Sequence, residues 1–358
     1  MFLSELDFQL CNAFDTDRLM PPEILSKVLR HLCSDGPLPL RHVLFVSKRF
    51  YNAAVNDAFL WTTISFDAVF FSYFRGRSIK QTNNFTKQCL LRSSALPLRL
   101  CIHTEQFGST YLQGALRILR NPKYKGFERC TSLLWSNEFP DLVERIVALL
   151  PVELPSLQHL SLYQFNYHKC ISKFPNCPLL RRVELFQCLL DSPNPWAETF
   201  AHVTTLSIGM SSFSAYYALA VSPRLHELTI CAGDTEYLAP PTVRIRLGYL
   251  QILKVRGDVP ENMLLAFLAP ALKELHIEAN YSGNTAMDAP WDRFELRCLR
   301  LYVILPETVR AKEPLWVASL SWVVRQCTRL KTVYISKWME EECKYFMVGL
   351  IDVSGPNT

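Results

Sequence analysis

The side chains that could bind a metal or act as nucleophiles are scattered along this sequence. Twelve cysteines and eight histidines are present, but no cysteine pair has the C-x-x-C spacing of a zinc ribbon or a thiol–disulfide enzyme. The strongest candidate metal site combines His168-Lys169-Cys170 with Cys177 and Cys188, which lack close paired spacing. We interpret these cysteines as structural residues of turns, and the sequence predicts no metal site.

Motifs of other enzyme classes are missing as well. The sequence contains neither G-x-G-x-x-G nor G-x-x-x-x-G-K-[ST], and its 12 glycines leave few positions where backbone could cradle a phosphate. It has no G-x-S-x-G elbow and no H-E-x-x-H helix, and its histidines do not cluster with a nucleophile. We therefore expect a non-catalytic protein without a cofactor.

Charge and composition restrict the partners and the compartment. The formal net charge of +5, from 38 basic and 33 acidic residues, is too small and too scattered to require a nucleic acid or an anionic membrane as partner. The first ten residues carry Glu5 and Asp7 and no basic region, unlike a secretory signal. Residues 199–223 are uncharged, but three threonines and five serines favour a strand and a helix over a membrane span. We expect an intracellular protein of the cytoplasm or nucleus, with reduced thiols.

An internal repeat occupies the C-terminal half of the 358-residue chain. The pattern L-x-x-L-x-L, with Val or Ile allowed, occurs eight times from residue 157, and successive starts lie 23, 23, 22, 25, 22, 24 and 34 residues apart. This spacing is typical of leucine-rich repeats. The aliphatic slots are Leu157/Leu160/Leu162, Leu180/Val183/Leu185, Val203/Leu206/Ile208, Leu225/Leu228/Ile230, Leu250/Leu253/Val255, Leu272/Leu275/Ile277, Leu296/Leu299/Leu301 and Leu330/Val333/Ile335, with a weaker copy at Cys130/Leu133/Trp135.

Each repeat predicts one short strand with a single buried face, because the second and third slots alternate with other residues. Four repeats have a proline two residues before the first slot, where proline ends the preceding segment and starts the strand. These prolines are Pro155, Pro178, Pro223 and Pro270. The segments 212–221, 261–268 and 314–326 look helical. The prediction is an α/β solenoid with a parallel concave sheet and outer helices; the alternative is an ordinary leucine-rich α/β sequence.

The remaining stretches give weaker signals. We predict a helix over 85–96, a strand over 98–103 and a second helix over 111–120, so that residues 65–128 form degenerate repeats or a connector. The solenoid proper is predicted over 129–352 and is irregular, because the Asn expected after each strand is mostly missing and the last interval is long. Residues 353–358 are polar and are expected to form a frayed tail.

The N-terminal region contains a second pattern. Pro21 and Pro22 suit the first turn of a helix that continues to Leu32, and Asp35-Gly36-Pro37 ends it. A second helix is predicted from Leu40 to about Asn56, followed by Leu60-Trp61. A segment this short cannot enclose all its apolar side chains. We therefore expect part of its apolar surface to contact another protein.

This segment resembles an F-box. The family pattern L-P-x-E-I-L, then V-[CS]-K-R-[WF], then a closing L-W is met at 20–25, 46–50 and 60–61, with Met20 in place of the usual Leu. With the repeats, the chain resembles an F-box protein with leucine-rich repeats, similar to those of mushroom-forming fungi. The predicted F-box covers residues 18–64, after an extension of residues 1–17.

The resemblance implies a substrate receptor of a Skp–cullin–F-box ubiquitin ligase. In that family the F-box binds the Skp-type adaptor, and through it the cullin, while the repeats bind the protein to be ubiquitinated. The alternatives are a plain helical cap on the solenoid, and a repeat scaffold that does not drive degradation. The residues implied to contact the adaptor are Met20, Pro21, Pro22, Ile24, Leu25, Val28, Leu29, Leu32, Val43, Val46 and Phe50.

The strands offer a second set of candidate binding residues. If the aliphatic slots point inward, the residues that flank the second and third slots lie on the opposite strand face. Aromatic and arginine side chains dominate interaction hot spots, so we expect those on this face to bind the target protein. The alternative is that they are merely side chains that a solvated sheet tolerates. The candidates are Tyr163, Arg182, Phe186, Arg256, Arg300, Tyr302 and Tyr334.

Overall fold

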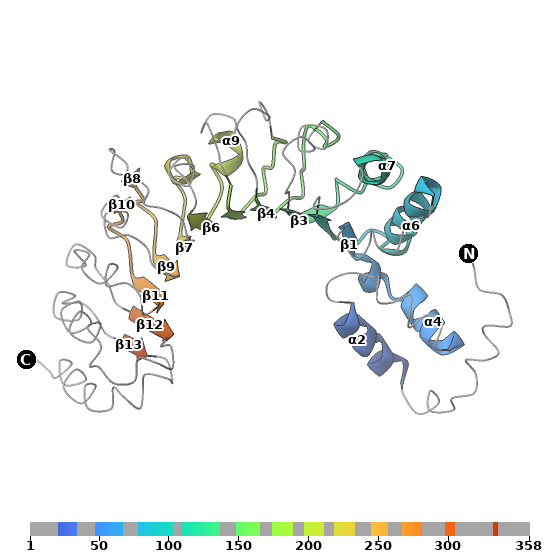
Figure 1. The fold of residues 1–358 in the computed structure, drawn as a ribbon, viewed down its shortest axis with the longest axis horizontal. Helices are drawn as coiled ribbons and strands as arrows, with labels where there is room; N and C mark the ends of the chain where they lie inside the picture. The colour runs from blue at the N-terminus through green and yellow to red at the C-terminus, as the bar shows by residue number, and fades with distance from the viewer. Residues whose placement is uncertain are drawn as a thin grey trace, which may run out of the picture. The chain divides into compact units, whose positions relative to one another are not determined.

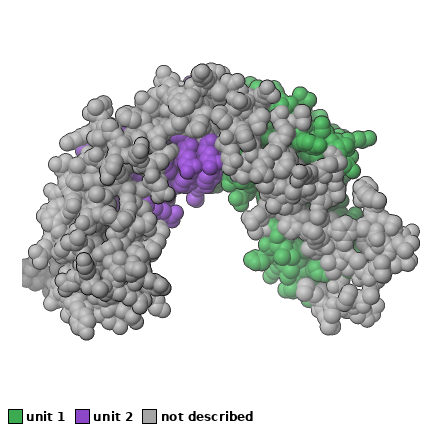
Figure 2. Space-filling model, in the orientation of Figure 1, with its two compact units in different colours: residues 1–162, 170–180 green, residues 163–169, 181–358 purple. Residues whose placement is uncertain are grey.

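The computed structural model describes residues 21–33, 47–66, 78–103, 109–136, 148–164, 174–188, 197–210, 218–232, 245–256, 267–280, 298–304 and 332–335. The chain divides into two compact units (Figure 2). The first unit comprises residues 1–162 and 170–180, and the second comprises 163–169 and 181–358. The second unit and most of the first are built on parallel strands.

The first unit begins with two helices and a 3-10 turn: α2 (Pro22–Leu32), α4 (Lys48–Asn56) and η2 (Ala58–Trp61). Helix α2 has Pro21 at its N-cap and Pro22 in its first turn, as predicted. Helix α4 ends at Asn56 as predicted and begins at Lys48, whereas the predicted helix began at Leu40; residues 40–46 lie outside the described residues. Ser47 is extended and its hydroxyl caps the helix by accepting a hydrogen bond from the Phe50 amide at 3.3 Å. The predicted helix end at 35–37 lies outside the described residues.

The sheet of the first unit contains β1 (Thr63–Phe66), β2 (Leu98–His103), β3 (Cys130–Ser136) and β4 (His159–Tyr163), in that order. The last residue of β4, Tyr163, already belongs to the second unit. Strands β1, β2 and β3 pair in parallel. The helices α6 (Ile79–Arg92) and α7 (Ser109–Arg120) connect them and lie on one side of these strands (Figure 1). The predicted strand over 98–103 matches β2, and the sheet already starts at Thr63.

Helix α6 differs most from its prediction over 85–96. It starts at Ile79, because Ser78 and Gln81 form a capping box in which the Ser78 amide donates to Gln81 Oε1 at 3.1 Å. It ends at Arg92, and Ser94 then takes a positive φ of 52°. Helix α7 starts two residues before the predicted 111–120 and ends where predicted.

The second unit has the strand order β5 (Arg182–Phe186), β6 (Thr205–Met210), β7 (Glu227–Ala232), β9 (Ile252–Arg256), β11 (Glu274–Asn280), β12 (Cys298–Ile304) and β13 (Thr332–Ile335). All neighbours pair in parallel, and equivalent slots stand opposite one another: Leu206, Leu228, Leu253 and Leu275 follow in one register. Every slot whose side chain the structure describes is buried. The repeat prediction is therefore confirmed: this is a leucine-rich solenoid with a parallel sheet.

The segments between strands match the prediction less well. A short helix, α9 (Ala197–Phe200), precedes β6. Residues 218–220, the described end of the predicted helix over 212–221, are helical. The helix predicted over 261–268 is wrong at its end, because Phe267–Leu268 form β10, which pairs with β8 (Ile245–Arg246). The helix predicted over 314–326 lies outside the described residues.

In the repeats whose turns the structure describes, a tight turn precedes the strand and supplies a fourth buried position. The amide of the first slot donates to the carbonyl three residues earlier, for example Leu180 to Cys177 at 3.0 Å and Leu225 to Ser222 at 3.3 Å. The repeated prolines occupy the second position of these turns, which their fixed φ favours. The residues that open the turns are all buried: Phe127, Leu154, Cys177, Phe200, Ser222, Leu247 and Ala269.

Candidate interaction surfaces

Helix α2 divides its apolar side chains between a buried and an exposed stripe. Leu25 and Leu29 are buried against the other helices of this segment, whereas Ile24, Val28 and Leu32 are 44%, 40% and 50% exposed. The exposed three are spaced four residues apart, so they form one continuous stripe on the helix. This corrects the sequence analysis, which placed Leu25 and Leu29 on the same outward surface.

The other residues implied to contact an adaptor are only partly described. Pro21 and Pro22 are exposed, and Phe50 on α4 is half-buried. Met20, Val43 and Val46 lie outside the described residues. Phe59 on η2, which the sequence analysis did not single out, adds a further 56%-exposed aromatic ring. The exposed apolar surface of this segment is therefore narrower on α2 than predicted and also includes η2.

An ion pair holds α2 against α4 and η2. Arg30 Nε lies 2.8 Å from Asp57 Oδ2, and its Nη2 donates to Asp57 Oδ1 at 3.0 Å. The Ser26 hydroxyl also donates to Asp57, and the guanidinium lies 4.4 Å above the Phe59 ring. Burial works to raise the pKa of Asp57, but the hydrogen bonds from Arg30 and Ser26 outweigh it and hold the pKa below its usual value.

Trp61 connects these helices to the first repeats. Its indole Nε1 donates to the Ala54 carbonyl at 2.8 Å, and its ring is almost fully buried. The Arg92 guanidinium at the end of α6 lies 4.4 Å above the same ring. The N-terminal helical segment (α2, α4 and η2) is thus packed on the start of the sheet within the first unit.

The open strand face of the second unit consists of the residues that alternate with the buried slots. Two of its predicted members, Tyr163 and Phe186, stack with ring centroids 5.0 Å apart and planes inclined by 14°. Gly209 follows Phe186 on the next strand, and a Cβ there would lie 2.8 Å from Phe186 Cδ1. The missing side chain therefore gives the Phe186 ring room to lie over the backbone of β6. Sequence reasoning missed this role of Gly209.

Several charged residues of the open strand face form pairs among the described side chains. Arg182 Nη2 lies 2.7 Å from Glu184 Oε1, and Lys254 Nζ lies 2.5 Å from Glu227 Oε1. His276 Nε2 is 3.3 Å from Glu274 Oε2. The Tyr163 hydroxyl reaches Glu184 at 3.5 Å, and burial together with that carboxylate raises the pKa of Tyr163. Charges of both signs therefore compensate each other on this face.

The other candidates are placed by strand register. Arg256 is exposed and stands opposite Cys231 and Glu278 on the neighbouring strands. Arg300 stands opposite Tyr334, and Tyr302 stands opposite Glu278. The side chains of Arg300, Tyr302 and Tyr334 lie outside the described residues, so their binding role stays a prediction.

Most described cysteines are core residues, whereas Cys231 on β7 is only half-buried. Cys177 and Cys188, two members of the rejected metal candidate, are both buried, whereas 168–170 lie outside the described residues. Burial raises the pKa of Cys89, Cys130 and Cys177 to about 12, so these thiols stay protonated at neutral pH. Among the described residues, no group of three or more His, Cys, Asp or Glu is placed to hold a metal ion.

No described helix is long and apolar enough to cross a membrane. No known family profile matches the sequence, and no curated protein matches it.

Two solved structures are similar to the chain at low identity. One is TLR13 in its complex with ssRNA13, at 15% identity and a TM-score of 0.35, covering 69% of this chain and 34% of TLR13. The other is an internalin (inlF) from Listeria monocytogenes, at 12% identity and a TM-score of 0.31, covering 86% of this chain and 92% of the internalin. The chain thus spans about a third of the length of the TLR13 chain. The leucine-rich solenoid is established by the chain's own buried slots and strand register.

Proposed function

We propose that this protein is the substrate-recognition subunit of a Skp–cullin–F-box ubiquitin ligase. In this proposal the N-terminal helical segment binds the Skp-type adaptor and the repeats bind the target protein. The protein itself is non-catalytic and acts where such ligases work, in the cytoplasm or the nucleus. Its contribution to the reaction is to raise the effective concentration of a target lysine beside the charged ubiquitin carrier.

The observation that carries the proposal is the exposed aliphatic stripe of Ile24, Val28 and Leu32 on α2. Three aliphatic side chains at successive helical turns are the pattern with which an amphipathic helix enters a hydrophobic groove. The stripe lies within the segment that carries the F-box-like sequence pattern, and that segment is packed directly on a repeat solenoid. The helical segment therefore offers a surface for assembly with the adaptor, and the repeats offer a surface for recognition of the target.

The recognition half of the proposal rests on the open strand face. The stacked pair Tyr163 and Phe186 offers a rigid aromatic surface, flanked by the Arg182–Glu184 ion pair. Aromatic rings lose little conformational entropy on binding and are frequent hot spots. The paired charges of both signs suit a protein target of mixed charge.

The test of adaptor binding is co-purification from cells of the host organism. The variant Ile24→Asp/Val28→Asp places two charges on the stripe while leaving the buried Leu25 and Leu29 unchanged. We expect it to lose both the Skp-type adaptor and the cullin, because an unpaired charge in an apolar interface is strongly unfavourable. The matched control is Leu91→Asp/Val152→Asp, since these residues are 55% and 70% exposed outside the helical segment.

The outcomes separate the ligase from the simple scaffold. Retention of the adaptor by the stripe variant would refute the adaptor-binding surface. Capture of the adaptor without cullin by the unmodified protein would favour a scaffold that does not drive degradation. For the target, Tyr163→Ala/Phe186→Ala should remove specific captured partners and leave adaptor binding unchanged, and an identical partner set would exclude the aromatic pair as an anchor.

A further inference from the structure

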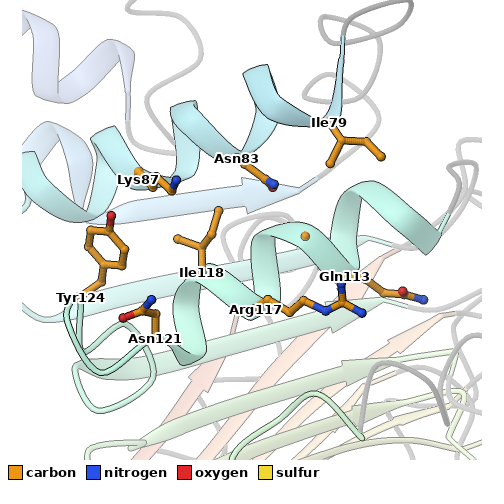
Figure 3. Close-up of a pocket in the computed structure, with 9 residues that line it drawn as sticks. Ile79, Asn83, Lys87, Gln113, Arg117, Ile118, Asn121 and Tyr124 are labelled. Atoms are coloured by element: carbon orange, nitrogen blue, oxygen red, sulfur yellow. The ribbon is translucent and has the colours of Figure 1, made fainter.

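A groove between helices α6 and α7 is separate from both surfaces described above. It has a volume of about 510 Å³, and polar side chains from both helices point into it (Figure 3). The polar lining consists of Asn83 and Lys87 from α6, Gln113 and Arg117 from α7, and Asn121 and Tyr124 from the turn that follows. It therefore belongs entirely to the first unit.

Gly114 lets the two helices approach each other at the base of this groove. A Cβ at Gly114 would lie 2.6 Å from Asn83 Oδ1, so a larger residue would push α6 away from α7. Asn83 Oδ1 is buried at this contact and has no hydrogen-bond partner among the described residues. With its oxygen turned inward, the Asn83 side chain is left with its Nδ2 amide to offer a ligand.

The lining presents donors and positive charge. Asn121 Oδ1 already accepts a hydrogen bond from the Lys123 amide at 2.9 Å, so its amide nitrogen remains free to donate. Lys87 is half-buried and Arg117 is exposed, and none of the lining residues is acidic. The groove therefore favours a ligand rich in hydrogen-bond acceptors and negative charge.

The charges along the whole of α6 and α7 also favour a negatively charged ligand. Together α6 and α7 contain Lys80, Lys87, Arg92, Arg117 and Arg120, and neither contains an aspartate or a glutamate. The complete chain is nearly balanced, with 38 basic and 33 acidic residues. A local positive field of this kind attracts anionic ligands and speeds their association.

We infer that the α6–α7 groove binds an acidic segment of a partner protein. Lys87 and Arg117 pair with two carboxylates, and the amides of Asn83, Gln113 and Asn121 donate to backbone carbonyls. The row from Ile79 to Lys87 spans nine residues of helix, or eight rises and roughly 12 Å, which fits about four residues of an extended peptide. Three neutral amides and two cations suit a peptide better than a nucleic acid, whose phosphates are bound chiefly by multiple Lys and Arg side chains. This inference does not depend on the proposed ligase function.

The test measures binding of a fluorescein-labelled peptide to the full chain by fluorescence anisotropy. The peptide has five glutamates between Gly-Ser ends. The groove variant is Lys87→Gln/Arg117→Gln. The matched control is Lys80→Gln/Arg120→Gln, which removes the same charge from the same helices at positions that do not line the groove. We expect the groove variant to weaken binding by at least about tenfold and the control by less than about twofold, because only the first pair makes direct charge-assisted hydrogen bonds.

Three results would overturn the inference. One is equal weakening by the two variants, which would mean general electrostatic attraction without a site. Another is equal or tighter binding of a peptide with glutamine in place of glutamate. The third is stronger displacement of the glutamate peptide by a ten-nucleotide poly-uridine RNA than by the unlabelled peptide. Thermal unfolding of each variant checks that the helices remain folded.

Discussion

The N-terminal helical segment and the open strand face of the second unit differ in the kind of side chain that they expose and in the interactions that stabilise them. The helical segment exposes aliphatic residues, and a polar cluster around Asp57 ties its helices together. The strand face exposes charges that pair with one another, while a repeated aliphatic ladder holds the sheet. An apolar stripe favours binding through burial, whereas a face of paired charges favours discrimination between partners. The two regions should therefore respond differently to the loss of one side chain.

The largest expected effect is on the aliphatic ladder. Leu228 is fully buried between Leu206 and Leu253 on the neighbouring strands. Replacing it with alanine should destabilise the protein by about 2–5 kcal/mol, through lost transfer free energy and the cavity that remains. Chemical denaturation measures this change, with Glu227→Gln as the control at a partly exposed position of the same strand. A change well below 1 kcal/mol would mean that the ladder does not hold the sheet.

The next effect concerns the contact between Gly209 and Phe186. Gly209→Ala should cost about 1–3 kcal/mol, because the added methyl overlaps the Phe186 ring and forces it to move. In a Phe186→Ala background the same change should cost clearly less, since the ring is gone and only the Phe186 Cα, 3.3 Å from the added methyl, still crowds it. A double-mutant cycle measured by urea denaturation gives this coupling. Additive costs would indicate that the methyl group strains the backbone instead of the ring.

A similar effect should follow from breaking the Asp57 cluster. Asp57→Asn leaves Arg30 without its carboxylate and should destabilise the helical segment by about 1–2 kcal/mol at neutral pH, discounted because Arg30 is half-exposed. The pKa of Asp57 is lower in the folded than in the unfolded protein, so its stabilisation is complete above the unfolded value of about 4 and is lost as the pH falls through the folded value.

Denaturation of the wild type and Asp57→Asn at pH 7 and at low pH tests this linkage. The difference in unfolding free energy between the two proteins should shrink as the solution is acidified. A difference that is the same at both pH values would show that Asp57 acts without its charge.

The smallest expected effect is on the surface ion pairs of the strand face. Glu227 and Lys254 are both partly exposed, so Glu227→Gln should change stability by less than about 1 kcal/mol. The same variant should alter the salt dependence of target binding if the face contacts a partner. A large loss of stability in Glu227→Gln would mean that this ion pair stabilises the fold. The expected difference in stabilisation between this pair and the Asp57 cluster would then be refuted.

The repeat pattern predicted one side of each strand well. Alternation places Val183, Leu206 and Leu228 on the buried side whatever their neighbours are, and the structure buries all three. The residues that open the turns were missed, because they share burial and a backbone hydrogen bond but no residue type. Phe200, Cys177 and Ser222 fill equivalent positions, and no sequence pattern joins a phenylalanine to a serine.

The interaction surfaces were harder to predict. On α2 two apolar stripes lie side by side, and periodicity alone cannot tell which of Ile24 or Leu25 faces the core. The ion pairs of the strand face depend on side-chain rotamers and diagonal neighbours, as Glu227 and Lys254 show. A signal for the start of α6 was present, since Ser78 and Gln81 have the spacing of a capping box.

The turns before the strands have a consequence for engineering this protein. Each described turn closes by a hydrogen bond between two residues of the same repeat, such as Leu272 and Ala269. The start of a strand is thus fixed locally, and the preceding segment is free to vary in length, as the intervals of 22 to 34 residues in the sequence already do. An epitope tag or a fluorescent reporter inserted upstream of a turn should leave the strand register intact. The same freedom would let natural insertions accumulate there without disturbing the sheet.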